Sequence, residues 1–379
     1  MKFNKLALVC ASALLATSSF ALAEIKVGVS LSTTGPGAAL GIPEKNAIAM
    51  LPTKIGDETA SYIVLDDATD PSAATKNARK LVDEDKVDVI IGSSVTPTTI
   101  AIAEVANETK TPNIAVAPAN LPPEKNAWVF RTPQHNSIMA SALIEHMKAN
   151  HIKTLGFIGF SDAYGEDWLT ALKKPLEEAG IKLDPVERYA RTDTSVTGQV
   201  LKLTSAKPDA ILVVGSGSPA GLPQTSLVER GYKGQIYQTH AAASPAFFKV
   251  AGKAAEGVIM PIGPVVVVDQ IASDHPSKAE GEKLVKEYNA KYGEGSFTSF
   301  AGHAHDAFKL LEAATPAALK AAKPGTPEFR QALRDALEAS KEVVGVHGVY
   351  NMTKDDHFGL DQRGRVLVKV VDGKYQLIK

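Results

Sequence analysis

The sequence predicts an α/β protein built from two doubly wound domains. Short β-rich runs alternate with helical patterns along most of its 379 residues, which is typical of helices layered on parallel sheets. One complete strand-helix-strand unit lies within residues 62–91. The chain is 44% hydrophobic, and its length suits two cores better than one.

The strand-helix-strand unit is the clearest element. Residues 62–65 form a short β-rich run, and Asp70 can cap a helix in which Pro71 loses no hydrogen bond. Apolar residues then recur at helical spacing as far as Val82. The β-branched run 87–91 follows and indicates a buried parallel strand.

The other elements continue this alternation. We predict a helix that follows Asp162 and ends at Gly180, and another that Thr326 opens. Residues 366–370 and 375–378 flank Asp372-Gly373 and predict a C-terminal hairpin. The predicted strands are residues 25–31, 62–65, 87–91, 113–117, 155–160, 210–214, 235–238 and 258–261.

The N-terminus has the pattern of an export signal. Lys2 and Lys5 precede an apolar run at residues 6–15, and residues 21–23 supply the small side chains that a signal peptidase needs. We therefore expect residues 1–23 to be removed and the mature chain to begin at Glu24. The single cysteine, Cys10, lies within this leader, so the mature chain should contain neither thiol nor disulfide.

The overall charge excludes some classes of partner. Lys and Arg number 41 against 42 Asp and Glu, for a formal net charge of −1. This balance gives no reason to expect nucleic acid or anionic lipid as a partner. After the leader, no segment is long and apolar enough to predict a membrane span.

Five motifs, spread over nearly the whole mature chain, resemble the Leu/Ile/Val-binding family of periplasmic solute receptors, which deliver ligands to ABC importers. The motifs are IKVGVSLSTTGPGAALG, YIVLDDATDPSAATKNARKLVDEDKVDVIIGSSV, FIGFSDAYGEDW, DAILVVG and YNAKYG. The resemblance implies two Rossmann-like lobes of the type I periplasmic binding protein fold, joined by three crossovers near residues 131–133, 262–264 and 347–351. Residues 24–133 and 265–345 would form lobe 1, and residues 134–264 and 346–379 lobe 2. The ligand would lie between the lobes, at the carboxyl ends of the strands.

Enzyme sites are weakly indicated. Residues 215–220 follow a strand and fit the dinucleotide pattern G-x-G-x-x-A, but residues 231–255 contain no acidic residue for the ribose contact. A tight strand-to-helix turn explains these glycines as well. The sequence has no G-x-S-x-G elbow and no phosphate-binding loop. A secreted enzyme that uses the cleft therefore stays an alternative, and we expect no cofactor.

Two groups of metal-ligating residue types also occur. His303, His305 and Asp306 could suggest a metal, but helical positions two apart diverge by about 200°. The acidic positions 355, 356 and 361 lack the spacing of a calcium loop. We expect no metal site.

Candidate binding residues follow the predicted strands. Thr96-Pro97 begins a helix after the strand 87–91, so its amides and hydroxyl could hold a carboxylate, although Thr96 could also be an ordinary helix cap. The resemblance adds Ser94, Ala119 and Asn120 nearby. From the second lobe it adds Tyr164, which could instead be a core aromatic.

The resemblance also predicts the class of ligand. Amino-acid receptors of the family pair the ligand ammonium with an acidic residue where this chain has His240, and no carboxylate stands near it in sequence. His240 could donate to a keto, hydroxyl or second carboxyl oxygen, or could be a plain loop residue. Leu40 and Ser216 stand where the family often has aromatic residues, which leaves space for a bulkier ligand. We therefore favour an aromatic carboxylate, such as a benzoate derivative or an aryl-oxo acid, over a branched-chain or other amino acid.

These observations predict a periplasmic, monomeric substrate-binding protein that works with an ABC permease in the inner membrane and is not an enzyme. A periplasmic ligand sensor would bind its ligand between closing lobes in the same way, so this class of protein stays open as an alternative.

Overall fold

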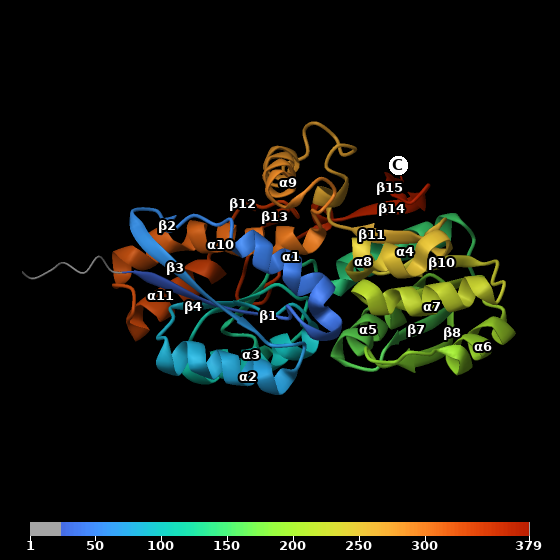
Figure 1. Ribbon diagram of the computed structural model, residues 1–379, viewed down its shortest axis with the longest axis horizontal. Helices are drawn as coiled ribbons and strands as arrows, with labels where there is room; N and C mark the ends of the chain where they lie inside the picture. The colour runs from blue at the N-terminus through green and yellow to red at the C-terminus, as the bar shows by residue number, and fades with distance from the viewer. Residues whose placement is uncertain (1–23, 379) are drawn as a thin grey trace, which may run out of the picture.

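The computed structural model describes residues 24–378. The predicted leader, with Lys2, Lys5 and Cys10, lies outside the described residues. The chain forms two lobes that lie side by side, each with its own sheet and flanking helices (Figure 1). No helix in residues 24–378 has the length and apolar character needed to cross a membrane. The predicted α/β class and the two lobes are confirmed.

The sheet of the first lobe has six strands and is parallel apart from its edge strand β2. Val29 in β1 lies between Val64 in β3 and Ile91 in β4. The strands β4 and β5 are buried along their whole length, as expected where helices cover both faces. In spatial order the strands are β2 (Lys54–Ile55), β3 (Glu58–Asp66), β1 (Ile25–Leu31), β4 (Val89–Gly92), β5 (Asn113–Ala115) and β6 (Val129–Arg131).

Helices cover both faces of this sheet. On one face, Ile90 packs with Leu81 and with Ile102 and Val105 of α3. On the other face, the central strands pack on α1, α10 and α11 in a second apolar cluster (Figure 1). The helices are α1 (Ala38–Ile48), α2 (Pro71–Arg79), α3 (Thr96–Thr109), α9 (Lys278–Tyr292), α10 (Ser299–Ala321) and α11 (Pro327–Glu338).

The second lobe has a seven-stranded sheet that is parallel from β8 to β11 and ends in the antiparallel C-terminal hairpin. The strands in spatial order are β15 (Lys374–Leu377), β14 (Val366–Val371), β11 (Ile259–Ile262), β10 (Gln235–Gln238), β9 (Ala210–Val214), β7 (Thr154–Phe160) and β8 (Lys182–Tyr189). Its helices are α4 (Asn136–Ala149), α5 (Ala163–Glu178), α6 (Thr197–Ala206), α7 (Gly217–Glu229) and α8 (Pro245–Ala251). A separate two-stranded ribbon consists of β12 (Val343–Val344) and β13 (Val349–Tyr350).

Most predicted helix starts are confirmed by their caps. The carboxylate of Asp70 accepts from the amide of Ala73 at 2.7 Å, and Asp162 and Thr326 cap α5 and α11 in the same way. The cap interpretation of Thr96 is wrong, because Val95 is the N-cap of α3 and Thr96 is its first helical residue. The strands β2, β6, β8, β12 and β13 were not predicted.

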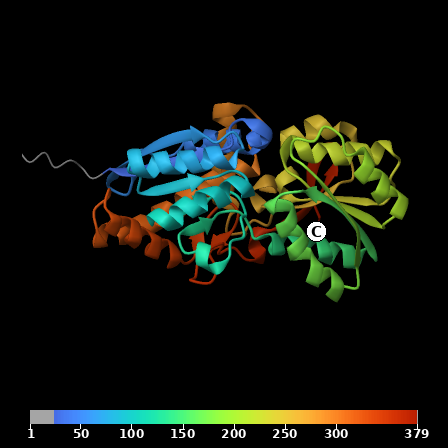
Figure 2. The same cartoon turned by 90° about the horizontal axis from the view of Figure 1, so that it is seen from below.

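The chain crosses between the lobes three times, after β6, after β11 and before β14. Figure 2 shows the blue segment near the N-terminus and the orange segment that follows residue 300 together in the first lobe. Tyr350, Met352 and Leu360 pack in the core of that lobe. We therefore propose that the third crossing lies between Leu360 and β14 and not near residues 347–351. The other lobe boundaries stay a prediction.

A buried carboxylate organises the region where these segments meet. Asp306 on α10 accepts hydrogen bonds from the amides of Val346 at 2.7 Å and His347 at 3.1 Å, and from the hydroxyl of Tyr350 at 2.8 Å. The ring Nδ1 of His347 lies 3.1 Å from the same carboxylate, and its Nε2 lies 2.9 Å from the hydroxyl of Ser299. A charge that is buried this deeply needs such partners, since desolvation is otherwise costly.

Two glycines make room for the imidazole of His347. A Cβ at Gly263, just after β11, would stand 2.4 Å from His347 Cδ2, and one at Gly302 would stand 2.6 Å from Cε1. Gln134, which follows the first crossing, also lies against Gly263 and donates to the carbonyl of Gly364 at 2.5 Å. Segments from all three crossings therefore meet around His347.

We predict that Asp306→Ala destabilises the protein strongly. The change leaves two buried amides and a ring nitrogen of His347 without their acceptor, while the hydroxyl of Tyr350 keeps the carbonyl of Thr132, so the free energy of unfolding should fall by about 3 to 5 kcal/mol. Urea denaturation followed by circular dichroism measures it. Glu177→Ala, which removes an exposed acid from α5, is the control and should change stability by less than about 0.5 kcal/mol. An Asp306→Ala protein as stable as this control would contradict the role given to Asp306.

Candidate ligand-binding site

A small cavity of about 20 Å³ lies between the two lobes. This volume is well below the range of about 300 to 1,000 Å³ that is usual for small-molecule sites, so the lining residues have to move apart when a ligand binds. Nearly all of its lining residues follow the carboxyl ends of strands, from β1, β4, β5 and β6 of the first sheet and from β7 to β10 of the second. Ligands bind at this edge in open α/β sheets. The lining residues are Leu40, Ser94, Val95, Thr96, Val116, Ala117, Pro118, Pro133, Tyr164, Arg191, Ser216, His240, Ala241, Phe300 and His303.

The structure brings six of the eight sequence-predicted residues together around this cavity. They are Leu40, Ser94 and Thr96 from the first lobe and Tyr164, Ser216 and His240 from the second. Their role in binding stays a prediction, but their proximity was not evident from sequence spacing.

Ala119 and Asn120 do not line the cavity. Ala119 is buried, and its carbonyl accepts from Nε of Arg131 at 2.9 Å. The side-chain amide of Asn120 donates to Asp167 on α5 at 3.2 Å, and Asn136 donates to the other oxygen of the same carboxylate at 2.5 Å. Asn120 thus connects the two lobes instead of facing the cavity.

A second contact between the lobes involves Gly217 at the start of α7. Its φ angle is +52°, and a Cβ there would stand 2.9 Å from the Cβ of Ala39 on α1. Only glycine combines this backbone with so close an approach. The lobes therefore touch at both of these contacts, and the structure represents a closed form.

Arg191 is the most important lining residue that sequence reasoning missed. It follows β8, and its Nε donates to the carboxylate of Asp162 at 2.6 Å, while Nη1 donates to the hydroxyl of Ser216 at 3.0 Å. The guanidinium lies 4.1 Å from the ring centre of Phe160, a cation–π distance. The side chain of Arg191 is only 11% exposed. Because β8 is a polar edge strand that contains Pro185, no sequence pattern marked the position that follows it.

Three polar atoms around the cavity have no hydrogen-bond partner among the described residues: Oγ1 of Thr96, Nδ1 of His240 and Nδ1 of His303. Burial lowers the pKa of His240 to about 3. Burial also lowers the pKa of His303 well below its usual value, and the nearby His347 and His240 add to this effect. Both imidazoles are therefore neutral at neutral pH. Unpaired buried polar atoms are costly, so these three suit an incoming ligand or water.

The cavity lining, all within residues 24–378, contains one arginine and no Asp or Glu. Behind the lining residue Ser94 lies the buried acid Glu44, which accepts a hydrogen bond from the hydroxyl of Ser94. Burial raises the pKa of Glu44 well above its usual value, which favours its neutral form. The lining therefore offers a cation no acidic partner, while the charge of Arg191 is already paired with Asp162 behind it.

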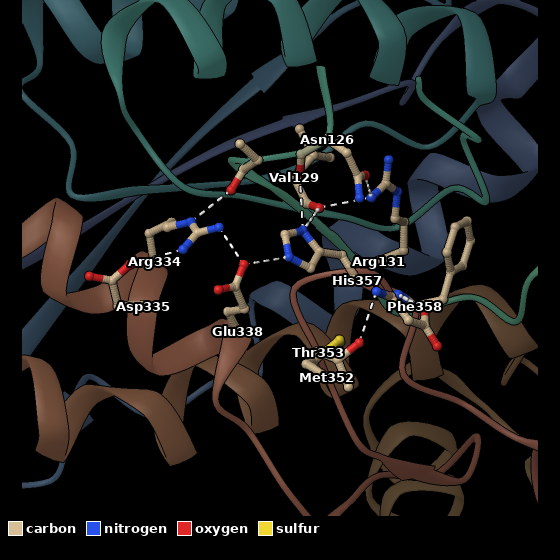
Figure 3. A network of polar contacts seen from close by, with 12 residues as sticks. Asn126, Val129, Arg131, Arg334, Asp335, Glu338, Met352, Thr353, His357 and Phe358 are labelled. Carbon is tan, nitrogen blue, oxygen red and sulfur yellow. Dashed lines mark hydrogen bonds and ion pairs between the residues drawn. The ribbon is translucent and has the colours of Figure 1, made fainter. Parts of the chain in front are cut away.

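A larger hollow of about 740 Å³ is a weaker candidate. Figure 3 shows its wall, where Nε2 of His357 lies 3.0 Å from Glu338 and Nδ1 lies 3.0 Å from the carbonyls of Asn126 and Val129. Arg334 pairs with the same Glu338. These groups already satisfy one another, so they leave little for a ligand to bind.

The contacts of Ser299, His347 and Asp306 follow the order of a hydrolase triad. However, Ser299 is only 4% exposed, His347 is fully buried, and neither residue lines the cavity between the lobes. A substrate carbonyl bound there would not reach the hydroxyl, as nucleophilic catalysis requires. The arrangement is explained by its structural role at the crossings.

The candidate metal ligands diverge in the structure. Asp306 faces the crossings, while Nε2 of His305 lies 2.9 Å from Glu280 on α9. Within residues 24–378 there is no group of three or more His, Cys, Asp or Glu side chains that could hold a metal ion.

Comparisons with known proteins agree with this geometry. A family model described as periplasmic binding protein matches residues 24–374. The Leu/Ile/Val-binding protein homolog 1 of Brucella suis biovar 1 is 25% identical over 389 residues, which cover 98% of each chain. An extracellular ligand-binding receptor from Rhodopseudomonas palustris HaA2 is 53% identical, with a TM-score of 0.93 over 94% of this chain and 100% of that one.

A solute-binding protein of an ABC transporter from Rhodopseudomonas palustris, solved in complex with benzoate, shares the fold at 22% identity. Its TM-score is 0.79, over 94% of this chain and 95% of that one. The resemblance stated from the sequence motifs is confirmed, and members of this family are periplasmic solute-binding receptors. The chain therefore belongs to the periplasmic binding protein family and is related to the Leu/Ile/Val-binding proteins.

Proposed function

We propose that this protein is the substrate-binding receptor of an ABC importer and that it captures a small aromatic carboxylate between its lobes. The observation that carries the proposal is the closed cavity, whose lining includes Arg191 and no carboxylate. The receptor would act as a monomer, since both walls of the cavity come from one chain. It would present its closed lobes to a permease in the membrane.

The carboxylate of the ligand can be held by both lobes. Nη2 of Arg191 has no hydrogen-bond partner in residues 24–378, and a guanidinium bonds carboxylates in a fixed, often bidentate geometry. From the first lobe, the unpartnered hydroxyl of Thr96 stands at the first turn of α3, where the helix dipole also favours a negative charge.

An α-amino acid fits this cavity poorly. Its ammonium group would lose water without gaining an acidic partner, which costs several kcal/mol. His240 cannot supply that partner, because the ring is uncharged and is itself 5% exposed. This agrees with the preference for an acid without an ammonium group that the sequence suggested.

The remaining walls suit a flat apolar ring. Leu40 and Phe300 line the first-lobe side and Tyr164 the second-lobe side. The hydroxyl of Tyr164 donates to Thr239 at 2.9 Å and is thereby satisfied within the protein. The part of Tyr164 that remains for a ligand is its aromatic ring. Related folds hold such acids, since solved relatives at 22% and 21% identity are complexes with benzoate and with 3,4-dihydroxybenzoic acid.

We expect aromatic acids to bind more tightly than amino acids. Isothermal titration should give benzoate, 4-hydroxybenzoate or benzoylformate a dissociation constant at least about tenfold below those of leucine, isoleucine and valine. A thermal-shift screen should agree, since ligand at a hundredfold excess over Kd stabilises the native state by about 2.7 kcal/mol. Tighter binding of an aliphatic amino acid, or chemical conversion of the ligand on incubation, would refute the proposal.

Thr96→Val should separate ligand binding from helix capping. Valine matches threonine in shape, and the hydroxyl has no partner in the protein, so the ligand-free melting temperature should stay the same or rise. Affinity for the aromatic acid should fall about tenfold. Thr326→Val is the control, because it removes a real cap and should cost about 1 kcal/mol of stability without changing affinity. If Thr96→Val binds normally, Thr96 does not contact the ligand.

Arg191→Gln should weaken binding of the acid by about 10- to 100-fold, because it removes the positive charge at the cavity. The matched control is Arg188→Gln, three residues earlier in β8, whose guanidinium pairs with Glu166 at the surface. Both variants should be titrated with the same acid after their melting temperatures are measured. Equal affinities in the two variants would show that the anion is held elsewhere.

A further inference from the structure

Two histidines approach the cavity from opposite lobes, and the function proposed above does not use them both. His240 follows β10 of the second sheet, and His303 lies on α10 of the first lobe. We infer that the ligand carries, besides its carboxylate, a second and uncharged oxygen, either a ring hydroxyl or a keto oxygen, and that these two imidazoles bind it. This inference deepens the proposed function and rests on it.

The ring of His240 is enclosed by aromatic side chains. Its centre lies 6.4 Å from the ring of Tyr164, in an edge-on arrangement, and 6.1 Å from the ring of Trp168. Such neighbours fill the space around the imidazole but offer Nδ1 no acceptor or donor, and the atom has no partner within residues 24–378. Nδ1 of His240 is therefore an unpaired polar atom between aromatic rings.

The ring of His303 is held in one orientation. It stacks on His347 with ring centres 3.8 Å apart and an angle of 15° between the planes. His347 cannot move freely, because Asp306 and Ser299 hold its two ring nitrogens. A binding group that is fixed in this way loses little freedom when a ligand arrives. Nδ1 of His303 is nevertheless buried without a partner.

The neutrality of both rings decides which group they accept. A neutral imidazole offers one donor and one acceptor, which match a hydroxyl, while the donor alone matches a keto oxygen. A second carboxylate would bring another negative charge into a cavity whose lining has one arginine, and that arginine already pairs with Asp162. Burial lowers the pKa of both histidines, so they would not readily supply the missing positive charge.

The same pair would couple ligand chemistry to closure. The two imidazoles belong to different lobes, so one oxygen can meet both of them only when the lobes are closed. An acid without this oxygen would leave two buried nitrogens unpaired in the closed form, and each unpaired group is destabilising. Such an acid can still bind through its carboxylate, but with lower affinity.

Two pairs of acids test the inference by isothermal titration on the unmodified protein. Benzoate and 4-hydroxybenzoate differ by a ring hydroxyl, and phenylacetate and benzoylformate differ by a keto oxygen in place of two hydrogens. In at least one pair, the acid with the extra oxygen should bind about 10- to 100-fold more tightly, as expected for one or two neutral hydrogen bonds.

Substitutions then locate the interaction. In His240→Leu and in His303→Leu the preference for the oxygenated acid should shrink at least fivefold, whereas His240→Asn and His303→Asn should keep most of it, since the asparagine side chain can place a polar atom near the position of Nδ1. Melting temperatures establish that each variant is folded. If a leucine variant does not fold, the comparison of acids on the unmodified protein decides alone.

The outcomes separate the two proposals. If benzoate and phenylacetate bind as tightly as their oxygenated partners, the inference from the histidines is overturned while the proposed function stands. A preference that persists undiminished in both leucine variants also overturns it, because the oxygen is then bound elsewhere. If no aromatic acid binds, the proposed function itself fails.

Discussion

The arrangement of the two lobes depends on one buried carboxylate. Asp306 gathers two backbone amides, a tyrosine hydroxyl and an imidazole, and this cluster lies where the segments that cross between the lobes come together. A charge without water must be surrounded by donors, so the carboxylate specifies the positions of its partners closely. His347 is thereby fixed, and His303, which stacks on it, carries this order to the wall of the cavity.

Closure and recognition use different contacts. Asp167 bridges Asn120 of the first lobe and Asn136 of the second, and Gly217 lets α7 approach α1 on the other side. These contacts join the two lobes. In the function proposed above, recognition is left to groups whose hydrogen bonds are incomplete, among them Arg191 and Thr96. A receptor built this way can form the same contacts between its lobes with different ligands, while the residues that line the cavity select the ligand.

The outcome for the candidate residues shows which kinds of inference succeed. Residues directly after strong strands, such as Thr96 and His240, line the cavity, because parallel strands bring their carboxyl ends to one edge. Asn120 follows a strand as well, but its loop turns the amide toward Asp167. Arg191 was missed because the edge strand before it is polar, and His303 was considered only as a metal ligand.

The sequence by itself determined the α/β class, the helix starts at Asp70, Asp162 and Thr326, and most strands, because these follow from local periodicity and capping chemistry. Its motifs also indicated the family. Only the tertiary structure decided which polar atoms lack partners and which side chains share the cavity. Those properties depend on how the fold brings together residues more than a hundred positions apart, such as Thr96 and His240, which line the same cavity, and local patterns do not contain that information.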